Sequence, residues 1–131
     1  MKKFYLFLFI ALAWTISASA QVPAFPGADG YGRYTTGGRG GEVYYVTSLE
    51  DTDTPGTLRY GVTHLSKVTI LFKVSGTIQL NSSLNIRGSN ITIAGQSAPG
   101  DGICLAGYPV SVSGSNVIVR YMRFRMGDWS L

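Results

Sequence analysis

Two arginines in the strand-like stretch at residues 117–126 are the side chains best suited to chemistry with an acidic ligand. Alternate side chains of a β-strand face opposite sides, so Arg123 and Arg125 would face outward while the apolar positions between them face inward: Met122, Phe124 and Met126. Two guanidinium groups on one outer face present forked N–H donors, which match carboxylates. A solvated pair of charges that discourages aggregation explains the same pattern equally well, so both interpretations stay open.

Other residues whose side chains could bind a metal ion or act in catalysis give weaker signals. Asp51 and Asp53 stand two positions apart in a polar loop, but this loop lacks the glycine and the distal glutamate of an EF-hand, which favours a solvated turn over a calcium site. His64 is the only histidine and has no partner near it in sequence, which favours a structural role. Cys104 is the only cysteine and lies between Ile103 and Leu105, as is typical of a packed thiol rather than a nucleophile.

The glycine-rich segment at residues 21–41 does not have the pattern of a phosphate-binding loop. It lacks a Gly-Lys-Ser/Thr ending, and no strand precedes its first glycines. We expect an irregular segment in which the aromatic side chains pack and the glycines adopt positive φ.

A repeat of about twenty-five residues predicts the architecture that would position these side chains. Asn90 and Asn116 each open a short β-branched stretch, and Lys67 and Glu42 precede similar stretches. Stacked short strands with Gly and Ser corners, and no leucine-rich or helical period between them, are typical of a parallel β-helix. The sequence therefore predicts an all-β fold.

The expected strands cover residues 42–46, 68–74, 76–80, 84–86, 91–94, 103–105, 110–112 and 117–126. Residues 57–65 predict a short helix, because Leu58, Val62 and Leu65 form one apolar stripe. We expect this helix to cover the open end of the β-helix, where core side chains and unpaired strand backbone would otherwise be exposed.

Residues 1–20 have the pattern of a secretory signal peptide: Lys2 and Lys3, then an apolar run, then Ala18-Ser19-Ala20 as the cleavage site. Cleavage would leave one domain at residues 21–131, exported from the cytoplasm and not attached to a membrane. The formal net charge of +4 would fall to +2 (4 − 2), because residues 1–20 hold two lysines and no acid. This mild charge, without a basic tract, argues against nucleic acid as a partner.

Several motifs in chain order resemble a known family. They are Ala24-Phe25-Pro26-Gly27-Ala28-Asp29-Gly30-Tyr31-Gly32, Thr36-Gly37-Gly38-Arg39-Gly40-Gly41, Pro55-Gly56-Thr57-Leu58-Arg59, Val74-Ser75-Gly76-Thr77-Ile78, Thr92-Ile93-Ala94-Gly95-Gln96, Asn116-Val117-Ile118-Val119-Arg120 and Arg123-Phe124-Arg125-Met126-Gly127-Asp128. Together they resemble the start of bacterial secreted pectate lyases of polysaccharide lyase family 1.

The resemblance implies a right-handed parallel β-helix that cleaves polygalacturonate, the acidic polymer of pectin, by calcium-dependent β-elimination. It implies that Arg123 and Arg125 line the start of the substrate groove, and that Asp128 stands where the family's calcium ligands begin, although a turn aspartate is an alternative. The family's acidic cluster and catalytic arginine would lie beyond Leu131, so the resemblance assigns no catalytic residue to this chain.

We therefore expect the N-terminal part of a secreted pectate lyase, inactive at this length. The alternatives are a non-catalytic β-helix that binds acidic polysaccharide, and a truncated remnant. A pectin hydrolase or esterase fits less well, because no strand here carries paired aspartates for acid and base roles.

Overall fold

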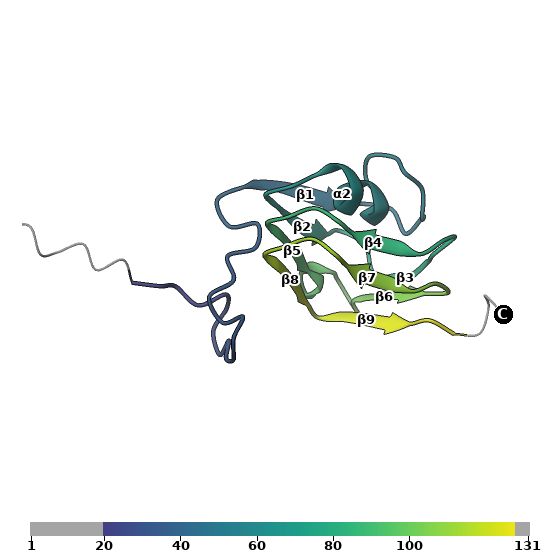
Figure 1. The fold of residues 1–131 in the computed structure, drawn as a ribbon. Helices are drawn as coiled ribbons and strands as arrows, with labels where there is room; N and C mark the ends of the chain where they lie inside the picture. Colours follow the sequence, from purple (N-terminus) through teal and green to yellow (C-terminus); the bar gives the residue numbers. More distant parts are fainter. Residues whose placement is uncertain (1–19, 128–131) are drawn as a thin grey trace, which may run out of the picture.

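The computed structural model describes residues 20–127 and contains three parallel sheets wound into a coil (Figure 1). The elements are β1 (Glu42–Val46), α2 (Leu58–His64), β2 (Val68–Phe72), β3 (Gly76–Gln79), β4 (Leu84–Ile86), β5 (Ile91–Ala94), the 3₁₀ helix η1 (Gly95–Ser97), β6 (Ile103–Ala106), β7 (Val110–Val112), β8 (Val117–Arg120) and β9 (Met122–Arg125).

Consecutive strands belong to different sheets, which is what makes the chain coil. The sheets have the orders β1-β2-β5-β8, β3-β6-β9 and β4-β7, and every pair is parallel. The chain thus passes from the first sheet to the second and the third before it returns one level further along. This arrangement is a parallel β-helix, so the all-β prediction and its architecture are confirmed.

The polar residues of the repeat form one corner of the coil. Lys67, Asn90 and Asn116 directly precede β2, β5 and β8, and all have left-handed backbone, with φ of 50°, 60° and 56°. Asparagine tolerates this conformation better than most residues, and Asn116 Nδ2 donates to Asn90 Oδ1 at 2.6 Å across adjacent coils. The repeat therefore forms a stacked corner. The prediction aligned Glu42 with Lys67, but Glu42 pairs with Val68, so the first corner residue lies one position before Glu42.

The interior of the coil is a stack of aliphatic side chains from all three sheets. Similar aliphatic residues of neighbouring coils pair in register: Ile70 pairs with Ile93, and Ile78 pairs with Leu105. Full burial of each such side chain contributes about 1.5–3 kcal/mol. The buried cluster comprises Val46, Leu58, Val62, Val68, Ile70, Phe72, Ile78, Leu80, Leu84, Ile86, Ile91, Ile93, Ile103 and Leu105.

The helix α2 covers the β1 end of this stack, as predicted (Figure 1). Thr57 caps its first turn by accepting a hydrogen bond from the Tyr60 N–H. Leu58 and Val62 are fully buried and Leu65 packs against the same core, so the predicted apolar stripe is confirmed.

The prediction of one continuous strand at residues 117–126 was wrong, because the chain forms two strands there, β8 and β9. Tyr121 has φ of 56°, which turns the chain out of the first sheet after β8 and into the second sheet at β9. The predicted inward direction of Phe124 agrees with its register, since it pairs with the buried Leu105, but Phe124 and Met126 are 52% and 55% exposed. β9 is the last strand of its sheet in the described part of the chain, so no further strand covers them.

The glycine-rich segment is irregular, as expected, and part of it ties the coils together. We call residues 36–41 the strap. The N–H groups of Thr36 and Gly37 donate to Asn116 Oδ1 at 2.9 and 3.2 Å, and the Gly38 N–H donates to Thr92 Oγ1 at 2.9 Å. The strap thus binds two successive coils of the first sheet. The packing predicted for the aromatics was wrong for Tyr31, whose side chain is fully exposed.

Tyr44 fastens the loop after β1 to the start of α2. Its hydroxyl accepts from the Gly56 N–H at 2.7 Å and donates to the Thr57 carbonyl at 2.9 Å. Burial raises the pKa of Tyr44 above its ordinary value of 10.0, and Tyr60 raises it further, while the two backbone hydrogen bonds lower it.

We predict that Tyr44→Phe lowers the free energy of unfolding by about 1–2 kcal/mol at neutral pH, because the variant loses both hydrogen bonds. A raised folded-state pKa contributes stability that is complete below the unfolded value of 10.0 and is lost as pH rises through the folded value. Urea unfolding at pH 7 and above pH 10 should show that Tyr44→Phe loses less stability at high pH than the parent. Equal losses would contradict this, and the exposed Tyr45→Phe is the control.

Candidate functional site

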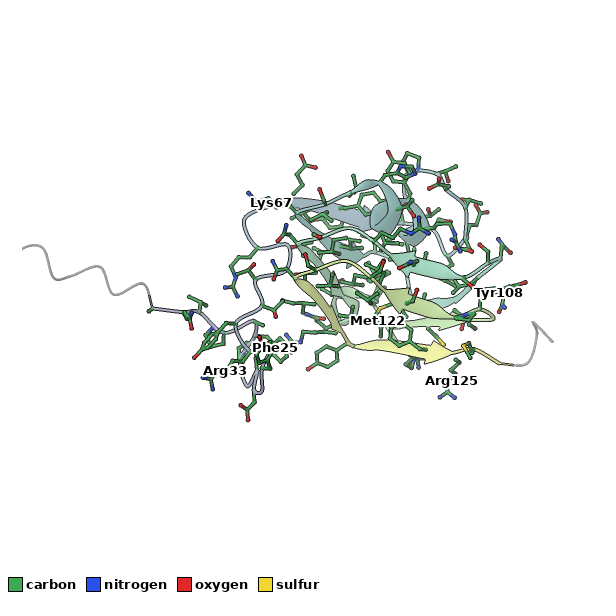
Figure 2. The ribbon with its side chains drawn as sticks, viewed as in Figure 1. Phe25, Arg33, Lys67, Tyr108, Met122 and Arg125 are labelled. Carbon is green, nitrogen blue, oxygen red and sulfur yellow. The ribbon has the colours of Figure 1, made fainter. Side chains whose placement is uncertain are left out.

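Arg123 and Arg125 lie where the sequence placed them, on the outer face of β9. Arg123 pairs in register with Cys104 and Arg125 with Ala106, both on β6. Both arginines are exposed, and Figure 2 shows Arg125 pointing away from the coil. Within residues 20–127 no carboxylate lies in ion-pair range of either guanidinium group. The pair can therefore accept an external acidic group.

An apolar cavity adjoins Arg125 at the end of the coil. It has a volume of about 190 Å³ and is lined by Leu105, Tyr108, Val110, Phe124, Arg125 and Met126. It lies beside β9, the last strand described in its sheet, where no further described strand covers Phe124 and Met126, so we assign it no ligand.

A third arginine nearby, Arg120, has a different role. Its guanidinium carbon lies 4.0 Å from the centroid of the Phe25 ring and 5.2 Å from that of Tyr121. These cation–π contacts hold the segment before the strap against the end of β8. The contacts of Arg120 therefore have a structural role, in contrast to the exposed arginine pair on β9.

Asp128, the predicted calcium ligand, lies outside the described residues. Residues 20–127 contain no group of three or more His, Cys, Asp or Glu side chains that could hold a metal ion. Calcium prefers six to eight oxygen ligands, rich in carboxylates. The described residues do not fit a calcium site.

The solvated turn predicted at Asp51 was wrong. Asp51 is 8% exposed and accepts from Arg59 Nε at 2.8 Å, from Arg59 Nη2 at 2.7 Å and from the Asn81 N–H at 2.7 Å. The ion pair links the loop after β1, the helix α2 and the turn before β4. Asp51, Arg59 and Asn81 do not recur at any regular spacing in the sequence, so the sequence pattern could not predict this contact.

His64 also has a partner that the sequence analysis missed. Its Nε2 lies 2.8 Å from Asp53 Oδ1, and its ring centroid is 4.8 Å from that of Tyr60. The expected structural role agrees with these contacts, because they join α2 to the preceding loop. Cys104 is a buried free thiol, as predicted.

No helix within residues 20–127 is long and apolar enough to cross a membrane. The predicted signal peptide at residues 1–20 lies almost entirely outside the described residues, so its presence and its cleavage remain predictions.

The chain is 43% identical over 119 residues to a protein named probable pectate lyase C from Emericella nidulans, a match that covers 90% of this chain. A protein of the same name from Aspergillus fumigatus is 42% identical over 121 residues. Pectate lyase 1 from Hesperocyparis arizonica is 46% identical over 72 residues, which cover 53% of this chain and 19% of the relative. This chain is similar to pectate lyases.

The chain matches only part of the length of these relatives, which come from fungi and a plant. The chain spans 28% of the length of the two fungal relatives. These pectate lyases are from fungi and a plant, so the bacterial source suggested by the motifs has no support among them. No family model matches the chain.

The chain is also similar to a solved structure. The crystal structure of jun a 1, the major allergen from cedar pollen, superposes with a TM-score of 0.54 at 32% sequence identity. The superposition covers 72% of this chain and 28% of the allergen. The similarity to this allergen thus extends to the fold of the coils described above.

Proposed function

We propose that this chain forms the first coils of a secreted, calcium-dependent pectate lyase that cleaves polygalacturonate by β-elimination. The observation that carries the proposal is the 43% identity to a pectate lyase over 90% of the chain. The exposed arginine pair on β9 adds a chemical reason, because polygalacturonate carries one carboxylate on each sugar.

β-Elimination removes the proton on the carbon next to the sugar's carboxylate and expels the glycosidic oxygen. Removing that proton builds negative charge beside a group that is already negative, so nearby cationic donors lower the barrier. In our proposal Arg123 and Arg125 bind and orient uronate carboxylates. We assign the proton-accepting base to no residue of this chain.

Calcium would supply further charge neutralisation at the substrate carboxylate. Since residues 20–127 offer no carboxylate cluster, we place the ion's ligands outside them, with Asp128 as a candidate. The proposed signal peptide at residues 1–20 would direct export and be cleaved in the process.

The test is an assay for the unsaturated uronate product of β-elimination, which absorbs ultraviolet light. The protein of residues 21–131 should form none, whereas a longer product of the same gene should form it with calcium and stop when the ion is chelated. Calcium-dependent product from residues 21–131 alone would contradict our placement of the calcium ligands. Absence of product from every longer form would contradict the proposed activity.

A second candidate is a non-catalytic module that binds acidic polysaccharide. It is favoured by one observation: the described residues combine exposed arginines with no metal-binding cluster. Retention on polygalacturonate without product from any form of the protein would support this function over the lyase.

A further inference from the structure

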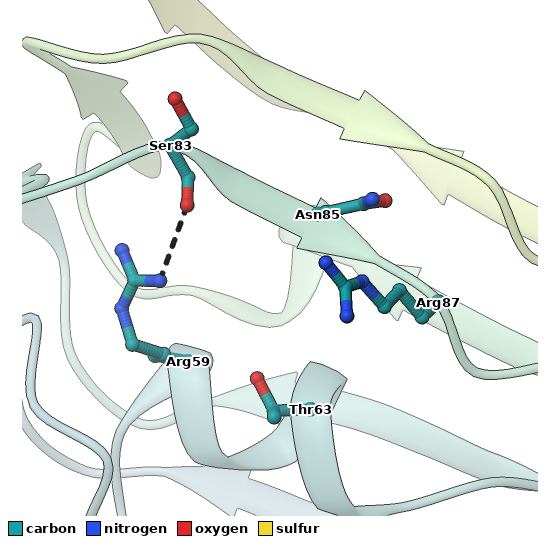
Figure 3. A pocket seen from close by; sticks show the side chains of 5 residues that line it. All are labelled: Arg59, Thr63, Ser83, Asn85 and Arg87. Carbon is teal, nitrogen blue, oxygen red and sulfur yellow. Dashed lines mark hydrogen bonds between the residues drawn. The ribbon is translucent and has the colours of Figure 1, made fainter.

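A cationic pocket lies between the helix α2 and the strand β4, away from β9. Its volume is about 210 Å³, and its lining residues are Arg59, Thr63, Ser83, Asn85 and Arg87 (Figure 3). Ligand pockets for whole small molecules usually span about 300–1,000 Å³, so this one suits a single charged group and the ring that carries it.

Arg59 is held rigidly at one side of the pocket. Its Nε and Nη2 donate to Asp51, and Nη2 also donates to the Ser82 carbonyl at 2.9 Å. Nη1 donates to the Ser83 carbonyl at 3.3 Å, which leaves one of its N–H groups without a partner. Because Asp51 balances its charge, Arg59 offers a fixed donor rather than a net positive charge.

Arg87 supplies the net charge at the other side. It directly follows β4 and is exposed, and no carboxylate of residues 20–127 lies in ion-pair range of it. Figure 3 shows the guanidinium groups of Arg59 and Arg87 directed toward the same space from opposite sides.

The rest of the lining suits an anion as well. Thr63 and Ser83 carry hydroxyl groups and Asn85 carries an amide, all able to donate hydrogen bonds, and no acidic side chain lines the pocket. Guanidinium groups with further donors match the oxygens of a carboxylate or phosphate.

We propose that this pocket binds the carboxylate of one uronate unit and so forms an accessory site for acidic polysaccharide. The inference rests on the proposed function for the identity of the ligand, but not for the anion chemistry. The pocket belongs to α2 and the β4-β7 sheet, whereas Arg123 and Arg125 belong to the β3-β6-β9 sheet. A polymer held at both places would be bound more tightly than at either one.

The experiment is a titration of the ¹⁵N-labelled protein with trigalacturonate, followed through the Nε–H signals of its arginines. We expect the Arg59 and Arg87 signals to shift. Arg87→Gln should weaken the affinity at this pocket roughly tenfold, the loss of one charge-assisted hydrogen bond. Arg33→Gln removes the same charge from an exposed residue outside both sites, so it is the matched control and should leave the response at Arg59 and Arg87 unchanged.

The outcomes separate this inference from the proposed function. Shifts at Arg123 and Arg125 with none at Arg59 and Arg87 would overturn the accessory site and leave the β9 site standing. The reverse pattern would support the accessory site and count against the β9 site. Neutral galactotriose should shift no signal at the pocket. If inorganic phosphate shifts Arg59 and Arg87 as strongly as trigalacturonate at equal concentration, the uronate assignment is overturned.

Discussion

Replacing Asp51 with asparagine is expected to lower the free energy of unfolding by about 3 kcal/mol. Removing one partner of a buried ion pair costs about 3–5 kcal/mol, because the other charge stays buried without compensation. The Asp51 side chain is 1% exposed and that of Arg59 is 17% exposed, so we expect the lower end of this range. Urea unfolding of parent and variant measures the difference.

Asp53→Asn is the matched control for this prediction. Asp53 lies two residues away and is hydrogen-bonded to His64, but its side chain is 53% exposed and that of His64 is 45% exposed. Exposed pairs contribute about 0–1 kcal/mol. If Asp51→Asn destabilises the protein no more than Asp53→Asn does, the buried pair does not hold α2 to the coil.

Gly38→Ala is expected to destabilise the protein by about 2–3 kcal/mol, in the upper part of the range for overpacked sites. A Cβ at this position would collide with the backbone carbonyl of Val68 and lie 2.8 Å from the Thr69 nitrogen. Since that backbone belongs to β2, inside the largest sheet, the strap would have to move away from the coil. It would then lose the hydrogen bond from Gly38 N to Thr92 Oγ1.

Gly32→Ala provides the control for the strap, because a Cβ there meets only Thr35 Oγ1 at an ordinary distance of 3.5 Å. Thermal unfolding should separate the two variants clearly, with a lower Tm for Gly38→Ala alone. Similar Tm values for both would show that the strap is not packed against β2 as described.

The strands and the helix could be predicted from the sequence because each has a local pattern. Corner asparagines such as Asn90 and Asn116 recur at the coil's period, and alternating apolar residues mark the strands between them. The helical spacing of Leu58 and Val62 predicted α2. The outward direction of Arg123 and Arg125 followed from strand alternation alone.

Contacts between residues that share no period could not be predicted. Asp51 meets Arg59 and Asn81 only because the loop, the helix and a turn of the next coil converge. The break at Tyr121 was missed because its neighbours on both sides favour strands, and only the change of sheet shows the turn. The pocket between Arg59 and Arg87 depends on the same convergence of α2 with β4.

Electrophoresis of the protein through a gel containing polygalacturonate tests the central claim most directly, because retardation reports binding of the acidic polymer. We predict that the parent is retarded and that the Arg123→Gln, Arg125→Gln double variant binds at least about tenfold more weakly. The control is Arg33→Gln with Lys73→Gln, which removes the same charge from other exposed positions and should be retarded nearly as much as the parent. Equal loss in both double variants, or no retardation of the parent, would contradict a carboxylate-binding site on β9.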